Sequence, residues 1–476
     1  MSQCPSNVYP LKGREFANIN SGLAAQYCAH LLKSLGGSVV KPNYISIKDV
    51  AIEAVNDWAQ SGLMYLTGLE NGLPLQGPGC IPSCAKGALD ALRLLAHQPL
   101  LSGINGSTLL CERAALLGLV RRGTVSPNGS CRLLKTKDHW IALNLARNDD
   151  WDLLPAWLEE PHLAVNQPTE DLWEQITSKI KHLDSQTLVA RGLLMGLPIA
   201  NANVHAKPAP WYKLGHRGST HIKKKQKNAQ PLVIDLSSLW AGPLCSYLLQ
   251  QAGARIIKVE SINRPDGARR GSKQFYNLIN SGKQSVALDF SSHRGRHQLK
   301  SILNKADIVI EGSRPRALQQ LGIDAELMVE SIPGLVWVSI SGYGRRPPES
   351  NWVAFGDDAA VAAGIAAATN NPPLFCGDAL ADPLTGLHAA VAALAFWSSG
   401  YGGLLDLSLC NTSAHCLNFA PTLPHGKLSG SPNDWQLTIE NHMSPVLPPS
   451  SRKSLGAAPA LGAHTEQILR EFQIVC

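Results

Sequence analysis

Between residues 231 and 344, apolar stretches of strand length alternate with stretches of helical periodicity, and this alternation limits what the chain can fold into. Strands that alternate with helices form a mostly parallel sheet with helices on both faces. We therefore predict an α/β fold with an open, nucleotide-fold-like sheet. The expected strands are 231–239, 254–260, 284–290, 307–312 and 335–344, and the expected helices are 243–251, 293–306 and 315–332.

A helix that ends at a glycine and leads into a short strand is expected twice, in residues 24–41 and 241–258. The two segments match at one fixed offset, and further matches follow in the same order. Because ordered matches indicate an internal repeat, we predict two diverged copies of one structural unit. The matched positions include Cys28 with Cys245, Gly36 with Gly253 and Gly87 with Gly386, together with 61–68 against 363–370 and 103–116 against 400–414.

The two copies are shortened in different places. The first has only residues 42–60 between its strand and its next match, where the second has the strand–helix region described above. Conversely, the first copy continues well beyond its last match, whereas the second soon ends. Within that continuation, residues 158–183 are expected to be helical, with Pro168 and Thr169 as the start signal.

The bulk composition is that of a globular chain. The 476 residues are 44% hydrophobic and 17% charged, and their number suits two or three domains. No run of about 18 apolar residues occurs, so we expect no membrane span, and the N-terminus has no signal-peptide pattern. The 11 cysteines show neither CxxC nor metal-ligand spacing, so we expect free thiols, no metal site and a cytoplasmic location.

Part of the net charge of +7 lies in the run HIKKKQKNAQ, residues 221–230. Such runs are usually solvated, and this one falls within 218–230, where we expect a basic linker between the copies. The alternative is a patch that binds an anion or a nucleic acid. Because no aromatic residues are interleaved with the basic ones, we expect no nucleic-acid partner.

An aspartate, Asp382, stands at the head of an apolar helical stretch, whereas Ser83 falls at this position in the first copy. A helix N-terminus offers free backbone N–H groups and a positive dipole end, which keep a carboxylate ionised. Pro383 suits the first position of such a helix. A positioned, partly desolvated carboxylate can form covalent acyl intermediates. The structural alternative is an ordinary N-cap, and Asp378 is the local rival for a catalytic role.

Six ordered motifs make residues 231–472 resemble the class III CoA-transferases. This is the family of formyl-CoA transferase and carnitine CoA-transferase, whose fold alpha-methylacyl-CoA racemase shares. Two segments of the first copy, 126–151 and 196–203, look like the smaller domain of the family. The six motifs are IDLSSLWAGPLCSYLLQQAGARIIKVE, LINSGKQSVALDF, ADIVIEGSRPRALQQLGID, VWVSISGYG, LADPLTGLHAAVAALAFW and LGAHTEQILREF.

The resemblance implies a division of the chain into four parts. Residues 1–115 would be a partial large domain with a degenerate catalytic position, and 116–217 would be a small α+β domain. Residues 218–230 would be the linker, and 231–476 would be a large CoA-binding domain that carries the catalytic residue. Members of the family form interlocked dimers, so one chain with two complementary copies could mimic part of a dimer, and a homodimer is also possible. We expect residues 116–215 to pack near Asp382.

The resemblance also implies the chemistry. The family aspartate that matches Asp382 attacks an acyl-CoA thioester, forms a mixed anhydride, and is then captured by CoA as an enzyme-bound thioester. Ser83 cannot repeat this chemistry, so we expect one working site in each chain. The substrates would be an acyl-CoA and a carboxylic acid, with no tightly bound cofactor.

The nucleotide of CoA would lie along the strand ends of the large domain. Lysine and arginine suit its phosphates. The alternatives are structural: Trp240 as a core aromatic residue, Lys283 as a surface turn lysine, and Gly342 as a residue that permits a tight turn. The candidate CoA-binding residues are Trp240, Ala241, Asn280, Lys283, Gly312, Ser313, Arg314, Ser341 and Gly342.

Several positions depart from the family pattern. Gly312 and Ser313 stand where the family usually has Asn-Phe, and Asp357 stands where an aromatic residue is common. These departures leave a second function open, that of a CoA-binding relative without catalytic activity. A third function, an acyl-CoA racemase or isomerase, needs a second proton carrier. The histidine that related racemases place near Asp357 is missing, and His388 is expected to be a helix-face residue.

Overall fold

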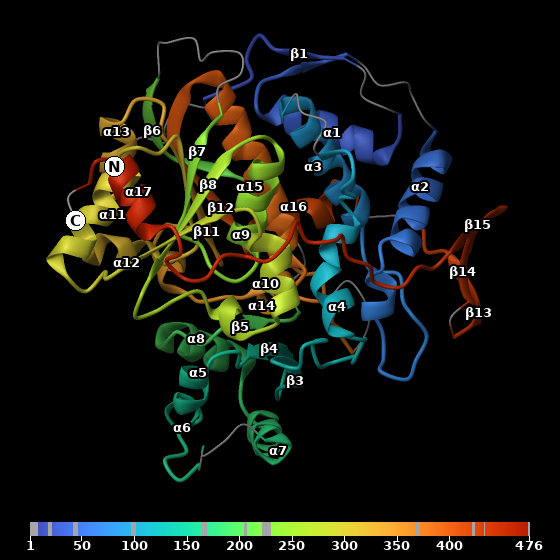
Figure 1. Ribbon diagram of the computed structural model, residues 1–476. Helices are drawn as coiled ribbons and strands as arrows, with labels where there is room; N and C mark the ends of the chain where they lie inside the picture. Colours follow the sequence, from blue (N-terminus) through green and yellow to red (C-terminus); the bar gives the residue numbers. More distant parts are fainter. Residues whose placement is uncertain are drawn as a thin grey trace.

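A seven-stranded sheet forms the centre of the computed structural model (Figure 1). The structure describes residues 8–17, 21–40, 46–96, 101–163, 165, 169–203, 207–220, 230–366, 372–420, 424–432 and 434–474. The strand order of the sheet is β6-β12-β11-β10-β7-β8-β9, and every pairing is parallel except that of β6 with β12. The mostly parallel α/β sheet predicted from the sequence is therefore confirmed. The strands are β6 (Lys213–Thr220), β7 (Leu232–Asp235), β8 (Arg255–Ser261), β9 (Gln284–Leu288), β10 (Ile308–Glu311), β11 (Val336–Ser341) and β12 (Tyr401–Ser408).

The sheet separates two hydrophobic layers, because successive side chains of a strand point to opposite faces. Val233 packs in the layer that contains α9 and α15, whereas its neighbour Ile234 packs in the layer that contains α11, α13 and α17. The helix expected over 315–332 is in fact two helices, because the chain turns at Gly322, whose φ is 76°. The helices are α9 (Ala241–Gln251), α10 (Lys273–Asn280), α11 (His293–Leu303), α12 (Pro315–Gln320), α13 (Ala325–Ser331), α14 (Gly356–Ala362), α15 (Ala381–Ser399), α16 (Leu409–Phe419) and α17 (Thr465–Glu471), with 3-10 turns η4 (Gly267–Arg270) and η5 (Glu349–Asn351).

The N-terminal helices extend the first of these layers and share its core. The helix pair α1–α3 resembles the pair α9–α15 in how closely the backbones approach. A Cβ atom on Gly87 would lie 2.2 Å from the carbonyl oxygen of Ala24, and one on Gly386 would lie 2.4 Å from that of Ala241. The N-terminal elements are β1 (Glu15–Phe16), α1 (Leu23–Ser34), β2 (Ser38–Val39), α2 (Ile47–Gln60), η1 (Leu63–Leu66), α3 (Ile81–Ala96), η3 (Thr108–Leu110) and α4 (Glu112–Leu117).

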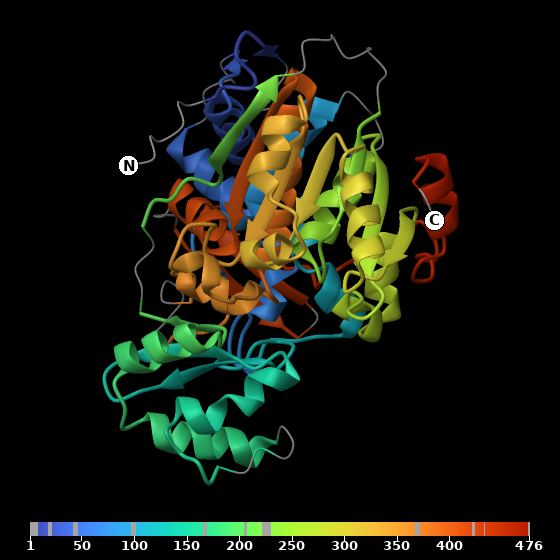
Figure 2. The ribbon, with the colours of Figure 1, turned by 90° about the vertical axis from the view of Figure 1, so that its left-hand side faces the viewer.

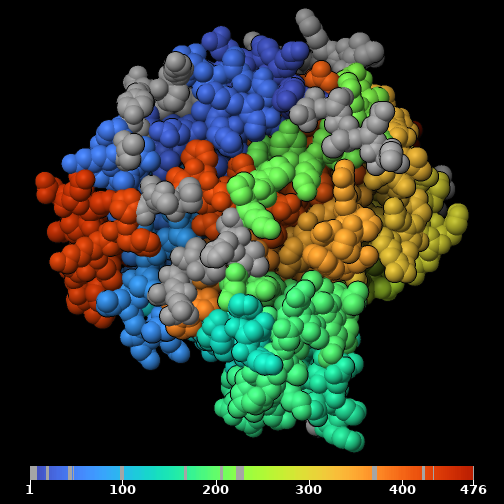
Figure 3. All heavy atoms as spheres, turned by 180° about the vertical axis from the view of Figure 1, so that it is seen from behind, coloured from blue at the N-terminus to red at the C-terminus, as the bar shows by residue number. Residues whose placement is uncertain are grey.

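A smaller α+β unit projects from one end of the body, as Figures 2 and 3 show. Its antiparallel sheet and its helices enclose a hydrophobic cluster of their own. The start signal predicted at Thr169 is confirmed, because the Thr169 hydroxyl caps α7 by accepting a hydrogen bond from the Leu172 N–H at 3.2 Å. The helix itself is shorter than the expected helical segment 158–183. Pro168 lies outside the described residues. The unit consists of β3 (Cys131–Lys135), β4 (Trp140–Asn144), α5 (Asn148–Asp152), α6 (Leu154–Trp157), α7 (Glu170–Ile180), α8 (Ser185–Met195) and β5 (Ile199–Asn201).

The C-terminal segment crosses back over the molecule after a small antiparallel sheet. This sheet contains β13 (Lys427–Ser431), β14 (Asp434–Ile439) and β15 (His442–Pro445), and it packs against α2. The chain then returns to the central sheet, where α17 lies against β9. Most of the predicted basic linker, residues 221–229, lies outside the described residues. No helix in the described part of the chain is both long and apolar enough to cross a membrane.

Candidate active site

Asp382 lies in the first turn of α15. Because α15 ends where β12 begins, its head lies at the opposite edge of the sheet, where the parallel strands have their carboxyl ends. The N-cap position is held by Leu380, which makes no side-chain capping bond. The alternative interpretation of Asp382 as an ordinary N-cap is therefore wrong.

The Asp382 carboxylate lies against the backbone of Gly356 at the start of α14. A Cβ atom at residue 356 would be 2.5 Å from Asp382 Oδ2 and 2.4 Å from the carbonyl oxygen of Ala379. Only glycine leaves room for this approach. The backbone N–H of Gly356 donates a hydrogen bond to the carboxylate, which helps to keep it ionised.

Two further carboxylates and one arginine surround this position. Arg113, from α4, donates two hydrogen bonds to Asp378, from Nε to Oδ2 at 2.7 Å and from Nη2 to Oδ1 at 2.6 Å. Asn128 donates to Oδ2 of Asp357 at 3.1 Å and to Oδ1 of Asp378 at 3.4 Å. The other oxygen of Asp357 accepts a bond from the N–H of Ala379 at 2.8 Å. Asp357 and Asp378 are fully buried, whereas Asp382 is half-buried.

The electrostatics of the cluster favour proton binding. Burial raises the pKa of Asp382 to about 7; the Arg113 cation opposes this rise, and the charges of Asp357 and Asp378 add to it. Burial and the charge of Asp378 also raise the pKa of Asp357. Burial alone would lower the pKa of Arg113, but its carboxylate neighbours raise it instead. At neutral pH, Asp382 is therefore poised between its acid and its carboxylate form.

The small α+β unit packs directly against this cluster. Asn144, at the end of β4, donates a hydrogen bond to Asp358 of α14 at 2.8 Å. Burial raises the pKa of Asp358 to about 7. An apolar contact between this unit and α14 supports the same junction. The prediction that residues 116–215 lie near the site is confirmed, and the domain boundaries themselves stay a prediction.

The sequence did not identify Arg113 or Asn128. Neither residue lies in a motif of the C-terminal half, and no local pattern distinguishes either one. The signal that pointed toward them was the expected packing of the small domain on the site. Both residues come from the N-terminal half, so the cluster is built from both halves of the chain.

The predicted CoA-binding residues fall into two groups. Gly312, Ser313 and Arg314 follow β10, Ser341 is the last residue of β11, and Gly342 follows it; all five are at least partly exposed at the carboxyl edge of the sheet. The buried group consists of Trp240, Ala241, Asn280 and Lys283.

The side chains of Trp240 and Lys283 have structural roles. Trp240 is 1% exposed and packs edge-on against Phe275, with the guanidinium of Arg113 5.0 Å from its ring centroid. This confirms the core-aromatic alternative. The expectation that Lys283 is either a surface lysine or a phosphate ligand is corrected, because it is 3% exposed and its ammonium group is fully engaged within the protein.

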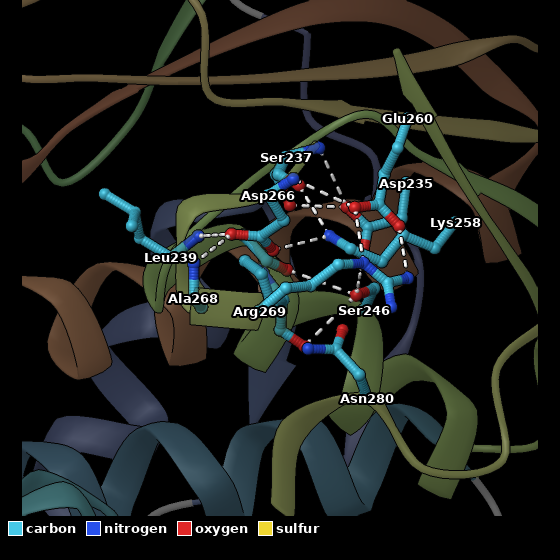
Figure 4. A network of polar contacts seen from close by, with 12 residues as sticks. Asp235, Ser237, Leu239, Ser246, Lys258, Glu260, Asp266, Ala268, Arg269 and Asn280 are labelled. Atoms are coloured by element: carbon cyan, nitrogen blue, oxygen red, sulfur yellow. Dashed lines mark hydrogen bonds and ion pairs between the residues drawn. The ribbon is translucent and has the colours of Figure 1, made fainter. Parts of the chain in front are cut away.

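Asp235 and Ser246 belong to a buried polar network beneath the carboxyl edge (Figure 4), and Lys283 is hydrogen-bonded to both. Its Nζ donates to Asp235 at 3.1 Å and to Ser246 at 2.7 Å. Burial lowers the pKa of Lys283 to about 8, although Asp235 opposes the shift. Lys258 ties the network to the neighbouring loops, because it donates to the carbonyl oxygen of Ser237 at 2.7 Å and pairs with Asp266 at 3.0 Å. The network thus fixes the loops at the edge without exposing a charge.

The head of α3 differs from the head of α15. Ser83 is buried and donates a hydrogen bond to Asp57 of α2 at 2.6 Å, and Lys86 donates to the other oxygen of Asp57 at 2.6 Å. His388 lies in the helix contact between α15 and α1, where its Nε2 is 2.7 Å from the hydroxyl of Tyr27. Within the described residues, no group of three or more potential ligands is arranged to hold a metal ion.

Comparison with known proteins identifies relatives over part of the chain. The chain is 31% identical over 207 residues to an acyl-CoA transferase of Fusarium pseudograminearum, covering 39% of this chain and 45% of that protein. It is 29% identical over 202 residues to the succinyl-CoA–D-citramalate CoA-transferase of Chloroflexus aurantiacus, covering 39% and 50%. It is 30% identical over 173 residues to a formyl-CoA:oxalate CoA-transferase of Escherichia coli, covering 34% and 42%.

The chain spans half or less of the length of these relatives. Among solved structures, a CAIB/BAIF family protein from Brucella suis matches 45% of this chain and 66% of its own, with 23% identity and a TM-score of 0.41. The family model for CoA-transferase family III matches residues 229–433. The matched segment of the chain is therefore similar to CoA-transferase family III, as its motifs predicted.

Proposed function

We propose that the protein is a CoA-transferase that moves CoA between an acyl-CoA and a carboxylic acid through a covalent intermediate on Asp382. The observation that carries this proposal is the state of Asp382. It is the half-buried member of a carboxylate cluster, and its pKa is raised to about 7. A carboxylate that is positioned and partly desolvated in this way is suited to nucleophilic catalysis. The CoA-transferases among the relatives support the same reaction class.

The reaction needs no external oxidant, reductant or proton. The Asp382 carboxylate attacks the thioester carbonyl, forms a mixed anhydride and releases CoA thiolate. The thiolate attacks the aspartyl carbonyl, forms an aspartyl thioester and releases the first carboxylate. The acceptor carboxylate attacks this thioester, and the thiolate released then attacks the acyl group of the second anhydride, which regenerates Asp382. Each step forms one bond and breaks one.

We assign the CoA nucleotide to the carboxyl edge of the central sheet. Ligands bind at this edge in open α/β sheets because loops and helix N-termini converge there. The segments that follow β8 and β10 carry exposed cations there that suit phosphate groups. These cations are Arg264, Arg270, Lys273 and Arg314. Lys283 is left out of this assignment because its ammonium group is buried.

The test is the mass of the intact protein after incubation with a mixture of acetyl-, propionyl- and succinyl-CoA. The expected result is a hydroxylamine-sensitive adduct on the wild type that is absent from Asp382→Ala. Asp171→Asn is a matched control, because Asp171 is an exposed carboxylate in the first turn of α7. An adduct that persists in Asp382→Ala would refute the assignment of the nucleophile.

The alternative function is a CoA-binding relative without catalytic activity. The observation that favours it is the burial of Trp240, Asn280 and Lys283, because these residues were expected to contact CoA. Bound CoA without an adduct, and without transfer to a panel of carboxylic acids, would select this alternative. Exchange of deuterium into the α-carbon of an acyl-CoA would instead indicate a racemase or isomerase.

A further inference from the structure

The candidate site contains a buried cation that comes from the N-terminal half of the chain. Arg113 lies on α4, and its side chain is held on two sides. On one side it makes a bidentate ion pair with Asp378, and on the other it stacks against the indole of Trp240. The indole is itself packed against Phe275 of α10. The cation therefore comes from the N-terminal half, and residues of the C-terminal half fix its position.

The geometry of the cluster brings this pair close to Asp382. Asn128 links Asp378 to Asp357, and Asp357 follows Gly356, whose backbone lies against the Asp382 carboxylate. Arg113 lowers the pKa of Asp382, whereas Asp378 raises it. Asp378 also restrains the guanidinium, so the two residues act as one unit with opposite signs. Electrostatic effects of this kind are strong where water is excluded.

We propose that the Arg113–Asp378 ion pair is a positioning unit that sets how much of Asp382 is ionised at neutral pH. The inference rests on the proposed function of Asp382 as the nucleophile. It gives the N-terminal half an electrostatic role in the C-terminal site, although its own counterpart of Asp382 is a serine. Arg113 and Asp378 are positioning residues, because they act through Asp382.

Further titratable groups lie around α14, which packs against α15. Asp357 of α14 raises the pKa of Asp382, and Asn128 holds Asp357 by a neutral hydrogen bond. Burial raises the pKa of an aspartate, a tyrosine and two cysteines in this region, so the tyrosine and the thiols stay neutral at neutral pH. These groups are Asp358 of α14, Tyr343 after β11, Cys131 of β3 and Cys410 of α16.

The ion pair can be broken from either side, and the two changes have opposite expected effects. Arg113→Gln removes the cation, so less of Asp382 is ionised at pH 7, and the midpoint for adduct formation moves to higher pH. Asp378→Asn removes an anion and frees the guanidinium, so the midpoint moves to lower pH. Each shift should be about one to three pH units, as is typical of neighbouring charges. A merely structural pair would lower the rate in both variants without moving the midpoint.

The experiment measures the rate of adduct formation with the same acyl-CoA mixture from pH 5 to pH 9, in the full chain. Arg255→Gln and Glu471→Gln serve as matched controls, because they break another bidentate ion pair at the start of β8. Arg113→Lys should keep the wild-type midpoint because it keeps the charge. Shifts of the same sign in Arg113→Gln and Asp378→Asn, or no shift in either, would overturn the proposal.

A second readout separates this proposal from the proposed function. Infrared difference titration of each protein against its Asp382→Asn form reports the ionisation of the carboxyl group without substrate. If no protein forms an adduct, the proposed function fails, and opposite infrared shifts would still support the role of the ion pair. If adducts form and the infrared midpoints coincide, the proposed function stands and the inference fails.

Discussion

Replacing Gly356 by alanine should show whether the reaction rate depends on the position of the Asp382 carboxylate and not only on its presence. The new Cβ atom would lie 2.5 Å from Asp382 Oδ2 and 2.4 Å from the carbonyl oxygen of Ala379, whereas ordinary contact begins at 3.4 Å. To restore ordinary contact the carboxylate must therefore move by about 0.9 Å, and the carbonyl oxygen of Ala379 is crowded as well. A misplacement of about 1 Å at a reacting group can cost roughly 100-fold in rate, or about 2.7 kcal/mol in the activation barrier. Overpacking should also lower the free energy of unfolding by about 1–3 kcal/mol.

The assay compares the rate of adduct formation of Gly356→Ala with that of the wild type, together with urea denaturation of both. Gly215→Ala is the control, because the nearest atoms to its Cβ would lie at 3.5 Å, within ordinary contact. A folded Gly356→Ala protein that reacts at the wild-type rate would refute the placement of the nucleophile against residue 356.

Three further outcomes follow from the buried charges. In the wild type, adduct formation should increase as the pH rises through about 7, the raised pKa of Asp382, and a flat profile from pH 6 to pH 8 would contradict this. The folded protein keeps a proton on Asp358, whose pKa is raised from 3.8 to about 7, so the free energy of unfolding should fall as the pH rises through this window. Asp358→Asn should flatten that fall, as measured by urea denaturation at pH 5 and pH 8. Lys283→Met leaves the buried Asp235 without one of its partners, so urea denaturation should show a free energy of unfolding lower by about 3–5 kcal/mol. A decrease of less than about 1 kcal/mol would contradict the buried network.

The sheet could be predicted because its strands are buried on both faces and therefore stand out as short apolar stretches. Helices are less distinct when they are short. The helix α10 was not predicted, and the segment 315–332 showed one helical pattern although Gly322 divides it. The periodicity on either side of that glycine is continuous, so the break depends on a turn that periodicity does not report.

The site was only partly predictable, for a physical reason. Asp382 lies in a local motif, so its position on the helix could be inferred from neighbouring residues. Lys283 also lies in a motif, but whether its ammonium group is exposed depends on Asp235 and Ser246, which pack over it from other elements. Arg113 reaches the site only through the packing of the N-terminal half. The internal duplication stays a prediction, and the matching approaches at Gly87 and Gly386 agree with it.

The heads of α3 and α15 show what distinguishes a structural charge from a reactive one. At α3, the carboxylate of Asp57 accepts hydrogen bonds from both Ser83 and Lys86, so the group is satisfied and stable. At α15, three carboxylates share the charge of Arg113, and an uncompensated carboxylate remains at half-buried Asp382. Folding alone would favour the arrangement at α3, because an unpaired buried charge is costly. Sites that violate the rules of stable packing are usually functional, so the imbalance at α15 supports our proposal that the chemistry takes place there and not at α3.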